Sequence, residues 1–412
     1  MTLVEPRRQG LWTLRRCAGW GLSALALALV SVWASANAAN DVCSAQDWPQ
    51  WRDFSRYFMA SDGRVLAANN VTRGSFSEGQ SYAMFFALVA NDRAAFERIW
   101  RWTQQNLMVN GADGLPAWTW GQATDGRWRV LDANSAADAD MWFAYALLEA
   151  GRIWQREDYQ QAGRRLLTAI TRQEVVLLPQ LGPMVLPGPV GFVQADGSWR
   201  LNASYLPLPL LRRFEMEAPQ GPWADVAANS LTLTSATSQK GFAADWTGYR
   251  ADPGRLPQFS MDPVTGPIGS YDAIRVYLWA GMTSANDPLA APLMQALRGM
   301  DTALVTQAVP PETVDLTTGV GRGVGPFGFS AALLPYLNVL GSTQAATQQA
   351  ERSRQLLTQS LTPDFLLKGP PPYYDHVLSL FGLGWTDNRF HFLPNGQVQL
   401  KWQTKCSPAN TH

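Results

Sequence analysis

Three acidic residues lie far apart along this 412-residue chain, and each begins an apolar segment. They are Glu78 in SEGQSYAMFFALV, Asp138 in SAADADMWFAYALL and Asp272 in SYDAIRVYLWAGM. The apolar pattern of each segment predicts a helix, with the acid in its first turn. Ser77 and Ser135 stand where the N-cap of a capping box is expected. For any single acid the helix dipole is a sufficient explanation, because it favours negative charge there by about 0.3–1 kcal/mol.

Carboxylates that meet beside aromatic rings are typical of enzymes that hydrolyse glycosidic bonds. One acid must protonate the leaving oxygen, while a second activates water or attacks the sugar. The sequence contains 18 tryptophans, whose flat apolar faces suit stacking on sugar rings. A general acid needs a raised pKa, whereas a helix N-terminus lowers it. Burial or neighbouring carboxylates must therefore dominate the pKa of Glu78.

Arg275 lies three residues after Asp272, on the same face of the predicted helix. This spacing occurs in ordinary surface ion pairs. It would also allow the guanidinium to keep an active carboxylate ionised and fixed in place. Both interpretations stay open from the sequence.

Helical patterns recur in pairs along the chain, separated by loops that carry Gly, Pro and Trp. The predicted helices span residues 78–90, 93–107, 136–154, 159–171, 204–214, 223–234, 272–283, 288–303, 329–340, 345–361 and 373–384. Short strands are expected in GSWRLN and GQVQLKW. Each of the three acids opens the first helix of a pair. A closed all-α toroid of helical hairpins would gather these helix starts on one face, and the lack of a strict repeat argues against a solenoid.

The first 38 residues have the features of a signal peptide. Arginines precede an apolar run at 22–34, which is shorter than the roughly 20 residues that a membrane-spanning helix needs. The A-x-A pattern at 36–38 fits a cleavage site, with 34–36 as a competing one, so the mature chain is expected to begin near Ala39. We therefore expect export to a periplasm or secretion, no membrane span in the mature form, and a single catalytic domain over 39–412.

Cys43 and Cys406 lie near the two ends of the mature chain. In an oxidising compartment they are a candidate disulfide, which would hold together the ends of a closed body. Two unpaired thiols are the alternative.

Other classes of function find little support in the sequence. The formal net charge is zero, so the basic excess of a nucleic-acid-binding protein is lacking. His376, His391 and His412 do not have metal-ligand spacing, and the Gly-rich stretch at 319–330 is not a phosphate-binding loop. Nothing in the sequence indicates a cofactor.

Several segments, in order along the chain, resemble glycoside hydrolase family 8. They are SEGQSYAMFFALVANDRAAF, LPAWTWG, NSAADADMWFAYALLEAGRIW, SYLPLPLL and SYDAIRVYLWAGM. The resemblance extends from about Trp48 to the C-terminus and is closest to periplasmic members encoded with bacterial cellulose synthase. It implies an (α/α)6 barrel and an inverting endo-β-1,4-glucanase acting on cellulose-type glucan, with a cellulose synthase complex as a further partner. Small departures from the family pattern at Ala83, Ala136 and Phe143 leave the acids unchanged.

The resemblance also implies a role for each candidate residue. Glu78 matches the proton donor, and Asp272 matches the base that activates water. Asp138 is expected to bind and distort the sugar and to tune Glu78, because an inverting reaction has no covalent enzyme intermediate. Tyr205 and Arg275 match residues that position the water and the base. An inverting pair predicts carboxyl groups about 6.5–9.5 Å apart.

Further aromatic residues are candidates for stacking on sugar units. They are Trp118, Trp120, Trp142, Trp199, Tyr271 and Trp279. For Trp142 and Trp279 a place in the core fits the sequence equally well. Trp100, Trp154 and Phe329 are expected to be core residues.

Two alternative functions stay open. An inverting hydrolase of the same fold, acting on xylan, chitosan or mixed-linkage glucan, would carry the same acids and differ in its cleft walls. The lack of an acidic excess argues against chitosan, which is cationic. A catalytically silent glucan-binding subunit of the synthase would be expected to lack Glu78 or Asp272, and both are present.

Overall fold

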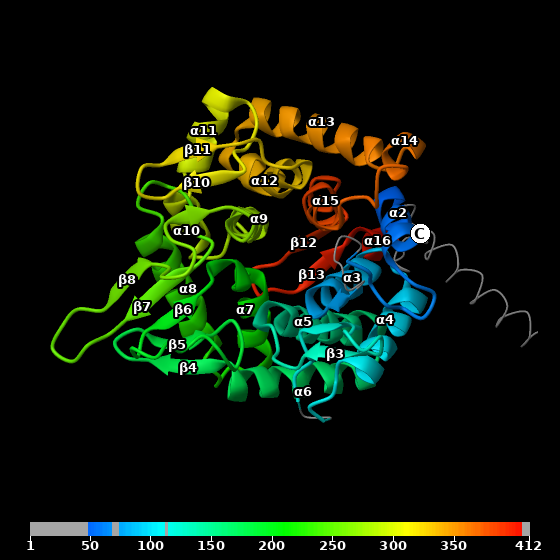
Figure 1. Cartoon of the computed structure of the whole chain (residues 1–412), viewed down its shortest axis with the longest axis horizontal. Helices are drawn as coiled ribbons and strands as arrows, with labels where there is room; N and C mark the ends of the chain where they lie inside the picture. The colour runs from blue at the N-terminus through cyan, green and yellow to red at the C-terminus, as the bar shows by residue number, and fades with distance from the viewer. Residues whose placement is uncertain (1–47, 68–73, 112–113, 406–412) are drawn as a thin grey trace, which may run out of the picture. The chain divides into compact units, whose positions relative to one another are not determined.

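Six helices form an inner ring in the computed structural model, which describes residues 48–67, 74–111 and 114–405 (Figure 1). All of these residues belong to one unit, Gln46–His412. The inner helices are α3 (Ser77–Val89), α5 (Ala137–Trp154), α7 (Leu208–Glu217), α9 (Ala273–Met282), α12 (Phe327–Leu340) and α15 (Tyr373–Thr386). Neighbours in this order contact one another, and Phe85 and Phe86 of α3 pack on Phe381 of α15, which closes the ring.

The inner helices are apolar on all sides because protein surrounds them on all sides. Helix α9, for example, is buried along its whole length. Two glycines allow the close packing of α9, α12 and α15. A side chain at Gly281 would collide with the backbone of Tyr336, and one at Gly382 would collide with the carbonyl of Ala331.

Outer helices pack on the inner ones and carry the polar surface. They are α4 (Arg93–Asn106), α6 (Glu157–Gln173), α8 (Trp223–Thr237), α10 (Ala290–Ala296), α11 (Gly299–Gln307) and α13 (Thr343–Gln359). Helix α2 (Pro49–Phe58), which precedes the ring in sequence, packs on α15 and supplies its outer partner (Figure 1). Shorter segments are η1 (Ala203–Tyr205), α14 (Pro363–Leu366) and α16 (Lys401–Lys405). This alternation confirms the predicted (α/α)6 barrel.

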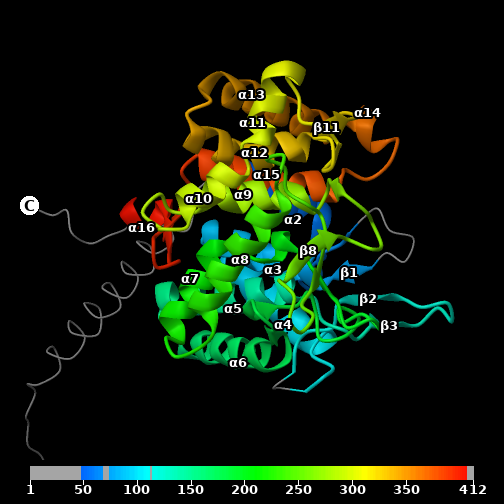
Figure 2. The same cartoon turned by 90° about the vertical axis from the view of Figure 1, so that its left-hand side faces the viewer.

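Short antiparallel sheets lie in the loops between helices. They are β1–β2–β3 (Ser75–Phe76, Thr119–Gln122, Trp128–Asp132), β4–β5 (Val175–Leu178, Gly182–Val185), β6–β7–β8 (Trp199–Leu201, Thr247–Arg250, Gln258–Met261), β9–β10–β11 (Ile268–Gly269, Thr313–Asp315, Val320–Arg322) and β12–β13 (Phe390–Phe392, Val398–Leu400). Strand β1 runs directly into α3, and β9 ends shortly before α9. Strands β1, β2, β3, β8 and β11 lie on the right in Figure 2, so the loops that carry them share the face on which α3 and α9 begin.

Two predicted helices are interrupted in the structure. The segment 204–214 forms η1 and then α7, because Pro207 and Pro209 have no backbone N–H to continue the helical hydrogen bonds. The segment 288–303 is divided into α10 and α11. Strands β6 and β13 confirm the strands predicted in GSWRLN and GQVQLKW, whereas α2, α14, α16 and the other strands were not predicted.

The predicted capping boxes are wrong. The N-caps of α3 and α5 are Phe76 and Ala136, and neither makes a side-chain capping bond. Ser77 and Ser135 instead donate to glutamate side chains. The Gln80 amide bonds to the backbone of the segment before α3.

The predicted signal peptide, Cys43 and Cys406 lie outside the described residues, so the disulfide remains a prediction. Among the helices that the structure describes, none is long and apolar enough to cross a membrane.

Candidate active site

Glu78 is the second residue of α3 and is partly buried. Its Oε1 accepts a hydrogen bond from the indole Nε1 of Trp118 at 3.0 Å, and Ser77 Oγ donates to Oε2 at 3.3 Å. Burial, and next the negative charge of Asp138, raise the pKa of Glu78 to about 7. The environment therefore outweighs the helix dipole, as a general acid requires.

Gly79, next to Glu78, leaves space for the hydroxyl of Tyr373. A Cβ at this position would lie 2.7 Å from Oη of Tyr373. Tyr373 is the first residue of α15. The glycine therefore lets the starts of α3 and α15 meet beside Glu78.

Asp138 is the second residue of α5 and is only 1% exposed. Its Oδ1 accepts from the backbone N–H of Ala139 at 2.8 Å. Its Oδ2 accepts from Tyr82 Oη at 3.4 Å and from Arg275 Nη1 at 3.2 Å. Burial raises the pKa of Asp138, and the positive charge of Arg275 opposes this effect. Both oxygens thus already have protein partners.

Asp272 is the N-cap residue of α9 and is more open, with 30% of its side chain exposed. Its Oδ1 accepts from Arg275 Nη2 at 2.6 Å, and its Oδ2 accepts from the indole Nε1 of Trp246 at 2.9 Å. Two donors on different elements therefore fix both oxygens of this carboxylate.

Arg275 connects the two aspartates. One guanidinium nitrogen donates to Asp138 and the other to Asp272, while Ser204 Oγ accepts from Nη2 at 2.9 Å. The side chain is buried, and its guanidinium lies 5.6 Å from the ring centroid of Tyr205. Arg275 is therefore no surface ion pair. It fixes two carboxylates that come from different inner helices.

Asp245 holds the backbone at the start of α9. Its Oδ1 accepts from the N–H groups of Ser270 at 2.7 Å, Asp272 at 3.1 Å and Ala273 at 2.7 Å. The side chain is 9% exposed, and its burial raises the pKa of Asp245 to about 6. The dipeptide Asp245-Trp246 thus fixes both the backbone and the side chain of Asp272.

A second acidic pair, Asp140 and Glu174, lies near Asp138, and both residues are fully buried. Ser135 Oγ donates to Glu174 Oε1 at 3.0 Å. Burial raises the pKa of Glu174 to about 8 and that of Asp140 well above its usual range, with the neighbouring acids adding to the effect on Asp140. The pair therefore holds a proton at neutral pH.

Three of the predicted aromatic residues lie at these carboxylates. Trp118 donates to Glu78, and Tyr205 lies beside Arg275 and Trp246. Tyr271, the neighbour of Asp272, is 47% exposed, and its hydroxyl donates to Glu312 Oε1 at 2.9 Å.

The prediction that Trp142 binds substrate is wrong. The ring is 1% exposed and packs among Tyr82, Phe85, Trp279 and Phe381, so it has no face open to a sugar. Trp279 is also in the core, as are Trp100, Trp154 and Phe329, which confirms the expectation for those three.

Trp199 does not reach the three acids, and its role in sugar binding stays a prediction. It lies on β6 beside Arg200, and consecutive strand residues point to opposite faces. Arg200 lies over the ring of Trp246 at 4.6 Å, whereas Trp199 packs on the buried Tyr249. The tryptophan that reaches Asp272 is therefore Trp246.

Trp120 is likewise not in contact with the three acids. The ring of Trp120 packs on Trp102 and Trp128 instead.

Sequence reasoning missed Asp245 and Trp246 altogether. They lie in the loop between α8 and β7, where neither a periodic pattern nor a motif marks them. An Asp-Trp dipeptide before a short strand was the only available signal. Their role depends on a contact with α9, about thirty residues later in the chain.

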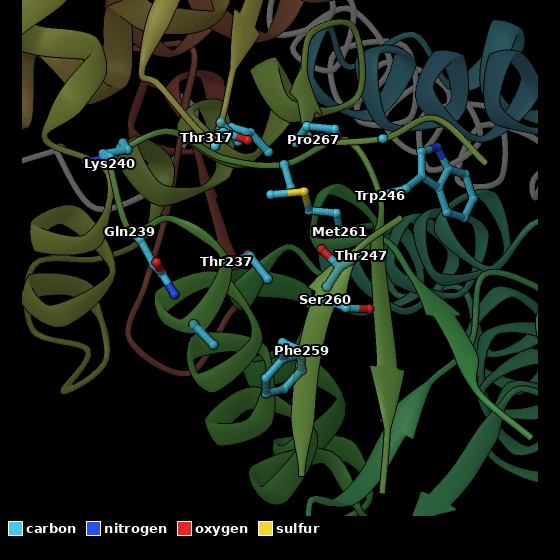
Figure 3. A pocket seen from close by; sticks show the side chains of 14 residues that line it. Thr237, Gln239, Lys240, Trp246, Thr247, Phe259, Ser260, Met261, Pro267 and Thr317 are labelled. Atoms are coloured by element: carbon cyan, nitrogen blue, oxygen red, sulfur yellow. The ribbon is translucent and has the colours of Figure 1, made fainter. Parts of the chain in front are cut away.

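A pocket of about 330 Å³ opens next to Trp246, between the end of α8, strands β7 and β8, and the two segments that contain Pro267 and Thr317 (Figure 3). Gln239 and Lys240 lie at the end away from Trp246. None of the three acids lines it. In the described part of the chain, no three His, Cys, Asp or Glu side chains are arranged to hold a metal ion.

Comparison with known proteins identifies the family to which this chain belongs. The family model "Glycosyl hydrolases family 8" matches residues 22–388. An endoglucanase of Xanthomonas axonopodis pv. citri is 47% identical over 92% of this chain and 95% of the relative, and one of Pseudomonas fluorescens is 44% identical over 88% and 93%. The crystal structure of the endo-1,4-D-glucanase of Vibrio fischeri ES114 matches with a TM-score of 0.78 and 39% identity, over 86% of this chain and 99% of that one. The chain therefore belongs to glycosyl hydrolase family 8.

Proposed function

We propose that this protein is an endo-β-1,4-glucanase that hydrolyses cellulose-type glucan with inversion at the anomeric carbon. The relatives named above, at 44% and 47% identity over most of both chains, are endoglucanases. The observation that carries the proposal is the pairing of two unlike carboxyl groups. Glu78 has a pKa raised to about 7, whereas Asp272 accepts hydrogen bonds from Arg275 and Trp246.

These environments suit different roles. Glu78, protonated near neutral pH, donates its proton to the glycosidic oxygen as the bond to the anomeric carbon breaks. Asp272 accepts a proton from a water molecule, whose oxygen attacks the anomeric carbon from the opposite face of the ring. The two donors on Asp272 orient the carboxylate, and its partial exposure leaves room for that water.

Asp138 is better suited to positioning than to nucleophilic attack. It is 1% exposed, and both of its oxygens have partners within the protein. Its negative charge is the second largest cause of the raised pKa of Glu78. Asp138 therefore keeps the general acid protonated. Its partner Arg275 also donates to Asp272, so the placement of Asp272 depends on that of α5.

The cellulose substrate is favoured over xylan, chitosan and mixed-linkage glucan by the names of the relatives at 39–47% identity. The zero net charge gives no support to a cationic substrate such as chitosan. Glu78 and Asp272 are both present with their partners, which argues against a catalytically silent glucan-binding subunit.

We also propose a periplasmic location and action on the glucan that a cellulose synthase complex exports. The support is the signal-peptide pattern of the first 38 residues and the resemblance of the sequence motifs. Secretion of the mature protein alone is the competing expectation, and fractionation of cells carrying the full chain separates the two.

The test is viscometry of carboxymethyl cellulose together with an assay of new reducing ends. Endo cleavage lowers the viscosity early, while few reducing ends have appeared. Glu78→Gln and Asp272→Asn should each lower kcat by about 10²–10⁴-fold and leave the fold intact. Glu97→Gln, at an exposed salt bridge on α4, is the matched control and should keep full activity. A well-folded Glu78→Gln protein with normal activity would remove Glu78 from the role of acid.

A further inference from the structure

The hairpin formed by β2 and β3 carries two tryptophans on one face. Trp120 pairs with Val130 across the hairpin, and Trp128 is two residues from Val130, so both rings lie on the same side of the sheet. The rings are stacked with centroids 5.0 Å apart and an angle of 24° between their planes. Trp102 of α4 packs edge-on against Trp120 from the body of the protein.

Arg64 lies against the same two rings. Its guanidinium carbon is 5.2 Å from the centroid of Trp120 and 4.9 Å from that of Trp128. Because these two distances and the ring–ring distance are nearly equal, the three groups form a triangle. If Arg64 and Trp120 stacked on the two opposite faces of the Trp128 ring, they would be about 10 Å apart. They therefore do not enclose the ring from both faces.

Among the residues that the structure describes, Trp120 and Arg64 are the ring and guanidinium groups that contact Trp128, and part of its ring stays exposed. Consistent with that, Trp128 is 41% exposed even though Trp120 and Arg64 support it from behind. A large exposed apolar ring that is held rigidly loses little conformational entropy when a ligand stacks on it. The hairpin thus presents a preorganised flat apolar surface.

We propose that the outer face of Trp128 is a binding subsite for a sugar unit of the glucan chain, away from the bond that is cleaved. This inference rests on the proposed function. The occupant follows from continuity with the active site: Trp118, which donates to Glu78, is two residues from Trp120, so their backbones are at most about 7 Å apart. A glucan chain that passes Glu78 and Trp118 can continue along the same hairpin to Trp128.

The subsite strengthens the binding of long substrates relative to short ones and does not take part in the chemical step. Under this proposal a short oligosaccharide bound across Glu78 ends before Trp128, whereas a longer one gains the additional stacking contact. Binding energy realised at a distance from the reacting bond lowers KM for the long substrate and changes kcat little.

The test compares Trp128→Ala with the wild type on cellotriose and cellohexaose. Binding is measured by calorimetry in a Glu78→Gln background, so that cleavage does not interfere. Trp128→Ala should weaken cellohexaose binding about tenfold, the loss expected for one aromatic contact, and should change cellotriose binding less than about twofold. Trp128→Tyr keeps a flat ring and should retain most of the affinity.

Arg129→Ala is the matched control. Arg129 lies on the same strand directly after Trp128, where the pairing register is regular, so its exposed side chain points to the opposite face and its loss should leave both affinities unchanged. Thermal unfolding of each variant checks that the hairpin and barrel remain folded.

Equal affinity of wild type and Trp128→Ala for cellohexaose would overturn the subsite and leave the hairpin face for another partner, such as a protein. Equal losses for both oligosaccharides would also overturn it, because the ring would then act at the cleavage point. Cleavage of neither oligosaccharide nor carboxymethyl cellulose by the wild type would instead refute the proposed function, so the two failures are distinguishable.

Discussion

The indole N–H of Trp246 donates a hydrogen bond to Oδ2 of Asp272 at 2.9 Å. The preceding residue, Asp245, accepts from the backbone N–H of Asp272 and of two of its neighbours. One dipeptide on a loop therefore fixes the proposed base twice, through its side chain and through its main chain. The same arrangement recurs at Glu78, where the indole of Trp118 is the donor.

Asp245→Asn and Trp246→Phe should lower kcat and leave KM nearly unchanged. Each variant loosens the carboxylate that must align the attacking water, and a misplacement of about 1 Å can cost about 100-fold in rate. We expect a loss of about 10- to 100-fold for Asp245→Asn and about tenfold for Trp246→Phe. Steady-state kinetics on cellohexaose provides the measurement.

A background that lacks the base separates positioning from general damage. In Asp272→Ala, azide supplied in solution replaces the water that the base would activate. Adding Asp245→Asn to that variant should leave the azide-dependent rate unchanged, because no carboxylate remains to be positioned. A further large fall would show that Asp245 supports the fold instead.

Arg275→Lys should damage both activity and stability. Arg275 reaches Asp138 and Asp272 with separate nitrogens, and a lysine ammonium cannot reproduce that fork. One ammonium can serve only one of the two carboxylates, and where the buried Asp138 is left without its ionic partner the cost should reach about 3–5 kcal/mol in the free energy of unfolding, seen as a lower Tm. The control is Arg354→Lys at an exposed pair with Asp387, where the change should stay below about 1 kcal/mol. Equal stability of the two variants would contradict the account.

Glu78→Gln should make the protein more stable at high pH but not at low pH. The ordinary glutamate pKa is 4.5 and the folded-state pKa of Glu78 is about 7. Below pH 4.5 the side chain is neutral in both the folded and the unfolded protein. Above pH 7 the folded protein must hold the negative charge in a partly buried place. The free energy of unfolding of the wild type therefore falls as the pH rises from 4.5 to 7. Glutamine stays neutral throughout. Allowing for partial exposure, the variant should gain of the order of 2 kcal/mol at pH 8 in denaturant unfolding, and a gain of the same size at pH 4 would refute the raised pKa.

Trp118→Phe should move the alkaline limb of the pH–rate profile to higher pH. The indole N–H stabilises the anionic form of Glu78 and so lowers its pKa, and phenylalanine removes this donor while keeping a ring. The acid would then stay protonated to a higher pH. Trp199→Phe, away from the acids, should leave the profile where it is. A shift to lower pH in Trp118→Phe would mean that the indole does not stabilise the carboxylate.

Much of the fold was predictable because the inner helices are continuous apolar segments. Glu78, Asp138 and Asp272 were found from the sequence because each lies at the start of such a segment, where helix periodicity begins. Predicted helix boundaries were wrong where the covalent chemistry of a residue, and not the apolar periodicity, ended a helix. Pro207 interrupts one predicted helix.

The supporting residues were not predictable in the same way. Trp246 lies in a loop and Trp199 on the short strand β6, and only the folded structure shows which of the two reaches Asp272. Trp142 follows Asp138 by one turn of the helix, yet it points into the ring of helices because five aromatic neighbours enclose it. These outcomes depend on contacts between residues distant in sequence, which periodicity does not encode.

The most direct test of the mechanism is proton NMR of cellohexaose cleavage by the mature protein, recorded before the products mutarotate. The new reducing ends should first appear as the α-anomer, since water activated by Asp272 attacks opposite to the bond that Glu78 protonates. New reducing ends that first appear as the β-anomer would contradict it, because retention requires a carboxylate nucleophile in place of an activated water.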